Sequence, residues 1–133
     1  MEDIGDILTR YRSITVVGCS RDETKYSYRV AKFMQDAGYT IIPINPFASE
    51  LLGEKVYRDI ASLPQPPEIV DVFRPAAEGL EITIQAVASG ARAVWLQEGI
   101  VNDDARKYAQ KHGVAFVQNR CIMKEYVRLN GEI

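Results

Sequence analysis

The chain has 133 residues, 47% of them hydrophobic and 26% charged, and its formal net charge is −2. This length allows one domain with a real core and is too short for two ordinary domains. The composition is typical of a globular protein, and a charge near neutral argues against a nucleic-acid-binding protein, because phosphates usually require a cationic face.

Short runs of β-branched and aromatic residues alternate along the chain with amphipathic helical stripes. The pattern predicts a short helix around residues 3–11 and a buried strand over 14–17 (ITVV). An amphipathic helix follows from Ser27, and Gly38 is its C-terminal stop. Its apolar residues repeat at i, i+3, i+4 and i+7: Val30, Phe33, Met34 and Ala37. A second strand is predicted over 39–44 (YTIIPI).

The segment 46–67 interrupts this alternation, because it is long and irregular, with one short helix expected over 59–63 (DIASL). Three further strands are predicted over 68–73, 93–96 and 115–118. The helices between them are indicated by two apolar stripes, Leu80, Ile84, Val87 and Ala88 up to Gly90, and Val101, Ala105, Tyr108 and Ala109 up to Gly113. Asn102 or Asp103 is the expected N-cap of the second of these helices. A last helix covers about 123–129.

Alternation of strands and helices predicts a doubly wound parallel sheet with right-handed crossovers. We expect an α/β, Rossmann-like fold with five strands in the order 3-2-1-4-5, as a single domain over residues 1–133. Ligands of such sheets bind beyond the carboxyl ends of the strands, here near the switch between strands 1 and 4. The residues that follow each strand are therefore the candidate site.

The loop after the first strand combines a glycine, small side chains and two cations, in Gly18, Cys19, Ser20, Arg21 and Lys25. Gly18 lets the backbone turn sharply beside a ligand, and the start of the next helix favours an anion. The alternative is an ordinary turn with solvated charges, since Asp22 and Glu23 offset both cations.

Polar residues also follow other strands. Asn45 and Pro46 stand where an NAD-binding protein normally has an acid for the ribose hydroxyls, and two of the three fingerprint glycines are absent, so NAD is not expected. Arg74 follows the third strand and suits a phosphate, or alternatively caps nearby carbonyls on the surface. The fourth and fifth strands are followed by Gln97, and by Asn119 and Arg120.

Seven segments together resemble the stand-alone CoA-binding domain proteins, in the order VVGCS, SYRVAKFM, GYTIIPINP, LLGEKVY, EIVDVFRP, GARAVWLQEGI and VQNRC. The likeness covers roughly residues 14–126. Those proteins are single-domain relatives of the CoA-binding part of the succinyl-CoA synthetase α subunit. The resemblance implies a Rossmann-like domain that holds coenzyme A along its strand ends.

The resemblance also implies three groups of ligand-binding residues. The phosphates would meet the first loop and helix start, with Gly18, Cys19, Ser20 and Lys25, and with Arg21, Tyr26 and Ser27 beside them. The adenosine 3′-phosphate end would be surrounded by Asn45, Pro46, Val72, Phe73 and Arg74. The pantetheine arm would lie toward Gln97, Asn119 and Arg120. Relatives often have a basic residue where this chain has Phe47, and further cations where it has Asp22 and Glu23.

Residues for catalysis or metal binding are not indicated. His112, the single histidine, lies at a helix end, where a cation offsets the helix dipole. The two cysteines lack zinc-ligand spacing. Cys19 lies beside a helix N-terminus and could be nucleophilic, although packing as a small side chain is favoured. We therefore expect a protein that binds CoA or an acyl-CoA, without catalysis of its own and without a metal.

Two alternatives remain open: a small NAD(P)- or acyl-CoA-linked enzyme that uses Glu98 or Cys19, and an adaptor whose degenerate site is empty. Apolar runs stay below the ~20 residues of a membrane span, and the acidic start is not a signal peptide, so a cytoplasmic protein is expected. The sequence does not fix its oligomeric state, and a monomer and a homodimer both remain open. A Cys19–Cys121 disulfide is not expected, because one strand should separate strands 1 and 5 by roughly 9–10 Å.

Overall fold

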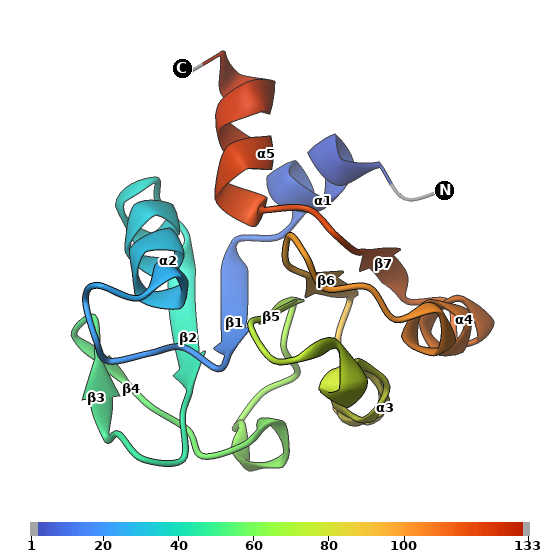
Figure 1. Cartoon of the computed structure of the whole chain (residues 1–133), viewed down its shortest axis with the longest axis horizontal. Helices are drawn as coiled ribbons and strands as arrows, with labels where there is room; N and C mark the ends of the chain where they lie inside the picture. Colours follow the sequence, from blue (N-terminus) through green and yellow to red (C-terminus); the bar gives the residue numbers. More distant parts are fainter. Residues whose placement is uncertain (1–2, 132–133) are drawn as a thin grey trace.

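Strands and helices alternate along the chain in the computed structural model, which describes residues 3–131 (Figure 1). The main sheet consists of β1 (Ser13–Val17), β2 (Thr40–Ile44), β5 (Ile69–Val72), β6 (Ala93–Leu96) and β7 (Ala115–Val117). The helices are α1 (Ile4–Arg10), α2 (Tyr26–Asp36), α3 (Gly79–Ala88), α4 (Asp103–Lys111) and α5 (Ile122–Asn130). The connections contain a small hairpin, β3 (Glu50–Leu51) and β4 (Glu54–Lys55), and two 3₁₀ turns, η1 (Ile60–Ser62) and η2 (Ala76–Glu78).

The main sheet is parallel throughout and has the order β2-β1-β5-β6-β7, which confirms a single Rossmann-like α/β domain. One strand assignment needs correction. The segment 68–73 was expected beside the second strand, but β5 pairs directly with β1, with Val17 opposite Val72. The place beside β2 is taken by a single parallel bridge between Ile44 and Tyr57. Counting that bridge as a vestigial third strand gives the order 3-2-1-4-5-6, which begins with the expected 3-2-1-4-5 and ends with β7 as a sixth strand.

Helices cover both faces of this sheet, so its strands are apolar on both sides. Figure 1 shows α1, α2 and α5 over one face and α3 and α4 over the other. Alternate strand residues divide between the two layers: Val16 and Trp95 pack with the first group of helices, and Val70 and Val94 with the second. Within residues 3–131, no helix combines the length and hydrophobicity that a bilayer crossing needs.

The buried face of α3 differs from the predicted one. Its buried residues are Gly79, Ile82, Thr83 and Ala86, whereas the predicted stripe of Leu80, Ile84, Val87 and Ala88 is half-buried or exposed. Small residues explain the rotation, because they allow a close approach: a Cβ on Gly79 would lie only 3.2 Å from Asn102 Cβ. Asn102 is confirmed as the N-cap of α4, where its side chain accepts a hydrogen bond from the Ala105 amide at 2.9 Å.

Asp71 is a buried acid in the middle of β5, opposite Val16 on β1 and Trp95 on β6. Its Oδ1 atom has no hydrogen-bond partner among the described residues. Burial raises the pKa of Asp71 well above its ordinary value, because the charged form loses its hydration. The protonated carboxyl is therefore the form that the folded protein favours.

We expect Asp71→Asn to stabilise the protein increasingly as pH rises. A carboxyl whose pKa is raised by folding contributes its full stability below the unfolded-state pKa, and this contribution is lost as pH rises through the folded-state pKa. Asparagine has the shape of the neutral acid and does not titrate. Thermal unfolding of both proteins should show a difference in Tm that grows from about pH 5 to about pH 8. A difference that is the same at both pH values would contradict the raised pKa.

Candidate functional site

A cleft of about 610 Å³ opens at the carboxyl ends of β2, β1 and β5. This is where ligands bind in doubly wound sheets. Its apolar lining comes from Val17, Ile44, Ile60 and Ile82. Its charged lining comes from two arginines and three carboxylates, Arg58, Arg74, Asp59, Glu78 and Glu81.

Gly18 is the point at which the three strand ends converge. Its φ is +85°, and a Cβ there would lie 2.7 Å from the Phe73 carbonyl oxygen and 3.0 Å from Arg74 Cδ. The Gly18 amide donates to the Ile44 carbonyl at 3.3 Å, and the Phe73 amide donates to the Val17 carbonyl at 2.9 Å. Only glycine fits this close approach, so the turn after β1 depends on it.

Asn45 joins the loops that follow β1 and β2. Its Nδ2 donates to the Cys19 carbonyl at 2.9 Å, and its Oδ1 accepts from the Phe47 amide at 2.7 Å. Arg21 adds a second link, since its Nη1 donates to the Phe47 carbonyl at 3.2 Å. The Phe47 side chain itself is 81% exposed at the cleft mouth. Asn45 therefore shapes the cleft with both ends of its amide already bonded.

The first loop is held by hydrogen bonds among its own residues. Ser27 Oγ accepts from the Ser20 amide at 3.0 Å, and Ser20 Oγ accepts from the Asp22 amide at 3.0 Å. Lys25 is exposed and is the N-cap residue of α2, without a side-chain capping bond. Ser20 thus lies in the cleft lining, while Ser27 supports it from the buried side of α2.

Arg74 lies in the cleft, but its guanidinium is already occupied by a carboxylate. Its Nε donates to Glu78 Oε1 at 3.0 Å and its Nη2 donates to Glu78 Oε2 at 2.9 Å. Hydrogen bonding from Arg74 lowers the pKa of the Glu78 carboxyl, so this pair is ionised at neutral pH. Both side chains are close to half exposed.

Cys19 lies in the cleft wall as a protonated, packed thiol. Burial first, and then the neighbouring Asp71, raise its pKa to about 11. Neither Cys19 nor Cys121 forms a disulfide. Two strands, β5 and β6, lie between β1 and β7, whereas the sequence analysis placed one there.

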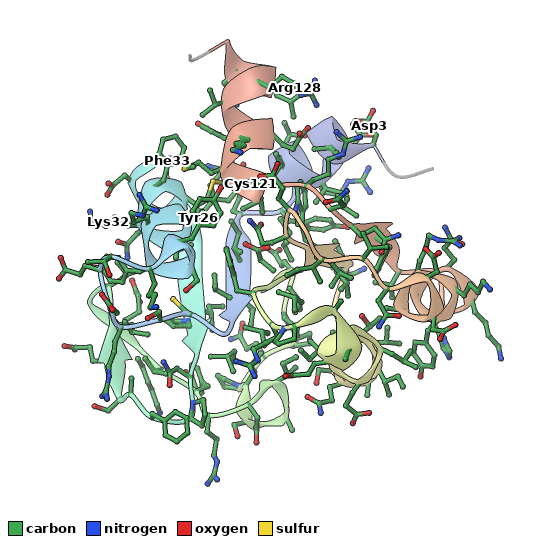
Figure 2. All side chains as sticks on the ribbon, viewed as in Figure 1. Asp3, Tyr26, Lys32, Phe33, Cys121 and Arg128 are labelled. Carbon is green, nitrogen blue, oxygen red and sulfur yellow. The ribbon has the colours of Figure 1, made fainter. Side chains whose placement is uncertain are left out.

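Cys121 and Tyr26 form a contact outside the cleft. The Tyr26 hydroxyl lies 2.8 Å from Cys121 Sγ, which joins the start of α2 to the start of α5 (Figure 2). The Tyr26 ring also packs edge-on against Phe73, with centroids 6.4 Å apart. These aromatic rings therefore support the layer of α2 and α5.

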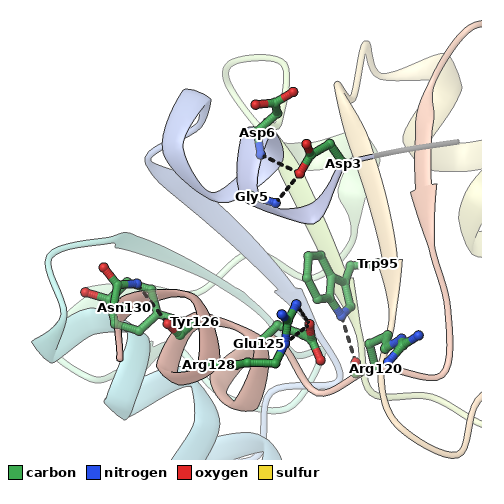
Figure 3. A network of polar contacts seen from close by, with 9 residues as sticks. All are labelled: Asp3, Gly5, Asp6, Trp95, Arg120, Glu125, Tyr126, Arg128 and Asn130. Carbon is green, nitrogen blue, oxygen red and sulfur yellow. Dashed lines mark hydrogen bonds and ion pairs between the residues drawn. The ribbon is translucent and has the colours of Figure 1, made fainter. Parts of the chain in front are cut away.

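The predicted residues after β6 and β7 are engaged in holding the start of α5. Gln97 is buried, and its Oε1 accepts from the Ile122 amide at 3.1 Å. The Arg120 carbonyl accepts from Trp95 Nε1 at 2.8 Å, as Figure 3 shows. Asn119 Oδ1 accepts from the Gly99 amide at 2.8 Å. Each of these contacts ties the β7–α5 loop to the end of β6.

The cleft therefore brings together some of the residues that the sequence predicted to bind the ligand. Six predicted residues line it: Gly18, Cys19, Ser20, Asn45, Pro46 and Arg74. Nine do not, namely Arg21, Lys25, Tyr26, Ser27, Val72, Phe73, Gln97, Asn119 and Arg120. Val72 is wholly buried in the core beneath α3 and α4. Among residues 3–131, no group of three acid, histidine or cysteine side chains could hold a metal ion.

The sequence analysis missed lining residues from two segments. Arg58, Asp59 and Ile60 come from the irregular segment 46–67, and Glu78, Glu81, Ile82 and Gln85 come from η2 and α3. The short helix over 59–63 was recognisable, but its place in the fold was not. This segment is placed by the single bridge between Tyr57 and β2, which has no periodic signal in the sequence.

Comparisons with known proteins show the family and the fold of the chain. Residues 12–127 match the family model described as "CoA binding domain". The chain is 36% identical over 120 residues to the uncharacterized protein YneT of Bacillus subtilis (strain 168), which covers 90% of this chain and 89% of YneT. A solved structure of a hypothetical protein from Pyrococcus horikoshii OT3 is 39% identical, with a TM-score of 0.92 over 97% of this chain and 91% of that one.

Larger proteins match as well. The chain is 22% identical over 129 residues to an ADP-forming acetate–CoA ligase of Methanocaldococcus jannaschii. That match covers 90% of this chain and 18% of the ligase, so the chain spans less than a fifth of the ligase.

We expect Gly18→Ala to destabilise the protein more than Gly99→Ala. Both glycines have a left-handed backbone, with φ of +85° and +88°, so each substitution should cost about 1–2 kcal/mol for the backbone alone. A Cβ at Gly99 meets nothing within 4 Å in the described chain, whereas one at Gly18 meets the Phe73 carbonyl. Gly18→Ala should therefore cost about 1–3 kcal/mol more in a urea unfolding experiment. Equal costs would contradict the close approach.

Proposed function

The chain belongs to the CoA-binding domain family, and on this basis we propose that it binds coenzyme A or an acyl-CoA in the cleft beyond β2, β1 and β5. The observation that best supports this proposal is the position of the cleft. It lies at the topological switch between β1 and β5, because β1 is followed by α2 on one face of the sheet and β5 is followed by α3 on the other face. The family match over residues 12–127 supports coenzyme A as the class of ligand.

The lining of the cleft has the chemistry that such a ligand needs. An adenine ring fits against the apolar side chains of Ile44, Ile60 and Ile82. A diphosphate can approach the loop after β1, because the start of α2 offers amides for an anion there. Lys25 is exposed beside that helix start. In this proposal, the pantetheine arm extends from there toward Asn119 and Arg120.

We further propose that the protein does not catalyse a reaction by itself. The cleft cysteine, Cys19, has a raised pKa and is therefore a poor nucleophile. The carboxylates of Asp59 and Glu78 already accept hydrogen bonds, from Ser62 and Arg74 respectively. Glu98, the other candidate acid, forms an ion pair with Lys124 on the surface. These engagements favour a binding protein over a general acid–base enzyme.

A second candidate function is an adaptor whose nucleotide site stays empty. The charge of the cleft favours it, since three carboxylates against two arginines give a net charge of −1 where a polyanion would bind. Phe47, at the mouth of the cleft, adds no cation. Ligand titration separates the two candidates.

We expect calorimetric titration to show binding of CoA and dephospho-CoA, and much weaker or absent binding of NAD. Binding in the cleft is tested by Ala77→Trp, which would place a large ring over the lining at an exposed position. This variant should weaken CoA at least roughly ten-fold, because the ring and the ligand cannot occupy the same volume.

Ala88→Trp is the matched control, since Ala88 is exposed at the far end of α3 and does not line the cleft. It should leave the affinity unchanged. Binding of neither CoA nor dephospho-CoA by the unaltered protein would favour the empty adaptor, and preference for NAD would favour an oxidoreductase.

A further inference from the structure

Arg58 stands at the cleft with a fixed backbone and an exposed side chain. Tyr57, the residue before it, is hydrogen-bonded to the end of β2 through both of its backbone groups. Its amide donates to the Pro43 carbonyl at 3.0 Å, and its carbonyl accepts from the Asn45 amide at 2.9 Å. Asp59, after it, caps η1, with Oδ1 accepting from the Ser62 amide at 2.9 Å. The segment is therefore held in place on either side of Arg58.

The guanidinium of Arg58 also forms no ion pair with the described residues. The ion pairs in this part of the chain are made by Lys32, Arg74, Arg106, Lys124 and Arg128. The other arginine of the cleft, Arg74, is held by Glu78 through two hydrogen bonds. Arg58 is thus the cleft arginine that can offer its whole planar fork to a phosphate without first losing a partner.

Displacement of Glu78 from Arg74 would bring little benefit to a bound phosphate. The released Glu78 carboxylate would remain beside the phosphate, since both groups compete for one guanidinium, and like charges at short range repel. Residue 47 offers no cation either, because Phe47 occupies it. A phosphate in this cleft therefore gains most by contact with Arg58.

We infer that Arg58 recognises the 3′-phosphate of the ligand, and that Glu78 withholds Arg74 from this role. The inference rests on the proposed function, and it replaces the expectation that Arg74 reads this phosphate. It makes Arg58 the residue that distinguishes CoA from dephospho-CoA, a ligand identical except for the phosphate. The cation comes from the segment after β4, and not from the position after Asn45 and Pro46.

The test is a set of titrations with CoA and dephospho-CoA. Arg58→Ala should weaken CoA roughly ten-fold, because a charge-assisted hydrogen bond is lost, and should change dephospho-CoA less than about two-fold. Arg74→Ala should weaken CoA clearly less than Arg58→Ala does. Arg58→Lys should keep part of the discrimination. Arg10→Ala, an exposed site on α1 with the same change in net charge, should leave both affinities unchanged.

Glu78→Gln provides a second, independent measurement. It should release Arg74 and tighten CoA several-fold, and Arg74→Ala should then weaken CoA more in this background than in the unaltered protein. For Arg58→Ala, the dependence of CoA affinity on salt should become shallower, because one phosphate contact is lost.

The outcomes separate the two proposals. If the unaltered protein binds both ligands, equal weakening of CoA and dephospho-CoA by Arg58→Ala overturns the role of Arg58 and leaves CoA binding intact. A larger and CoA-selective loss from Arg74→Ala does the same. If the unaltered protein binds neither ligand, the proposed function fails, and the inference fails with it.

Discussion

Three parallel strand ends meet at Gly18, and the distances there leave no space for a side chain. The Gly18 amide bonds to β2 through the Ile44 carbonyl, while the Phe73 carbonyl lies where a Cβ would project. This convergence brings together the loops that follow β2, β1 and β5, and the hydrogen bonds of Asn45 and Arg21 then join two of them. The cleft is the space that these loops enclose with η1 and α3. Its position follows from backbone geometry, and its selectivity from the few side chains on its rim.

The polar groups beneath and around the cleft differ in burial and in whether they form ion pairs. Asp71 in the core and Cys19 in the cleft wall both have raised pKa values, because burial disfavours their charged forms. Glu78 and Arg74 neutralise one another on the rim. Arg58 remains as a cation on a backbone fixed by β2 and η1. An anionic ligand therefore meets one arginine without an ion pair in the described chain, the carboxylates of Asp59 and Glu81, the backbone of the first loop and an apolar floor.

Local patterns in the sequence were sufficient for most of the fold, because strands buried on both faces and helices with an apolar stripe have distinct periods. The number of sheet strands, their parallel arrangement and the N-cap at Asn102 follow from such patterns. The face of α3 could not be read this way, since close packing selected small residues, Gly79 and Ala86, over the larger Leu80 and Ile84. The neighbour of β2 was equally hidden, because a one-residue bridge at Tyr57 has no periodicity.

The contrast between local patterns and long-range packing also explains which residues of the candidate site could be predicted. Residues that directly follow β1 and β2, such as Gly18 and Asn45, were found because strand ends can be located from the sequence. Arg58 and Glu78 were missed, because they reach the cleft through long-range packing of η1 and η2. The most direct test of CoA binding in this cleft is a titration of ¹⁵N-labelled protein with CoA, followed through backbone amide chemical shifts. The largest changes should fall on Gly18, Ser20 and Arg58, whereas changes confined to the opposite edge of the sheet, around Ser13, Thr40 and Glu68, would contradict it.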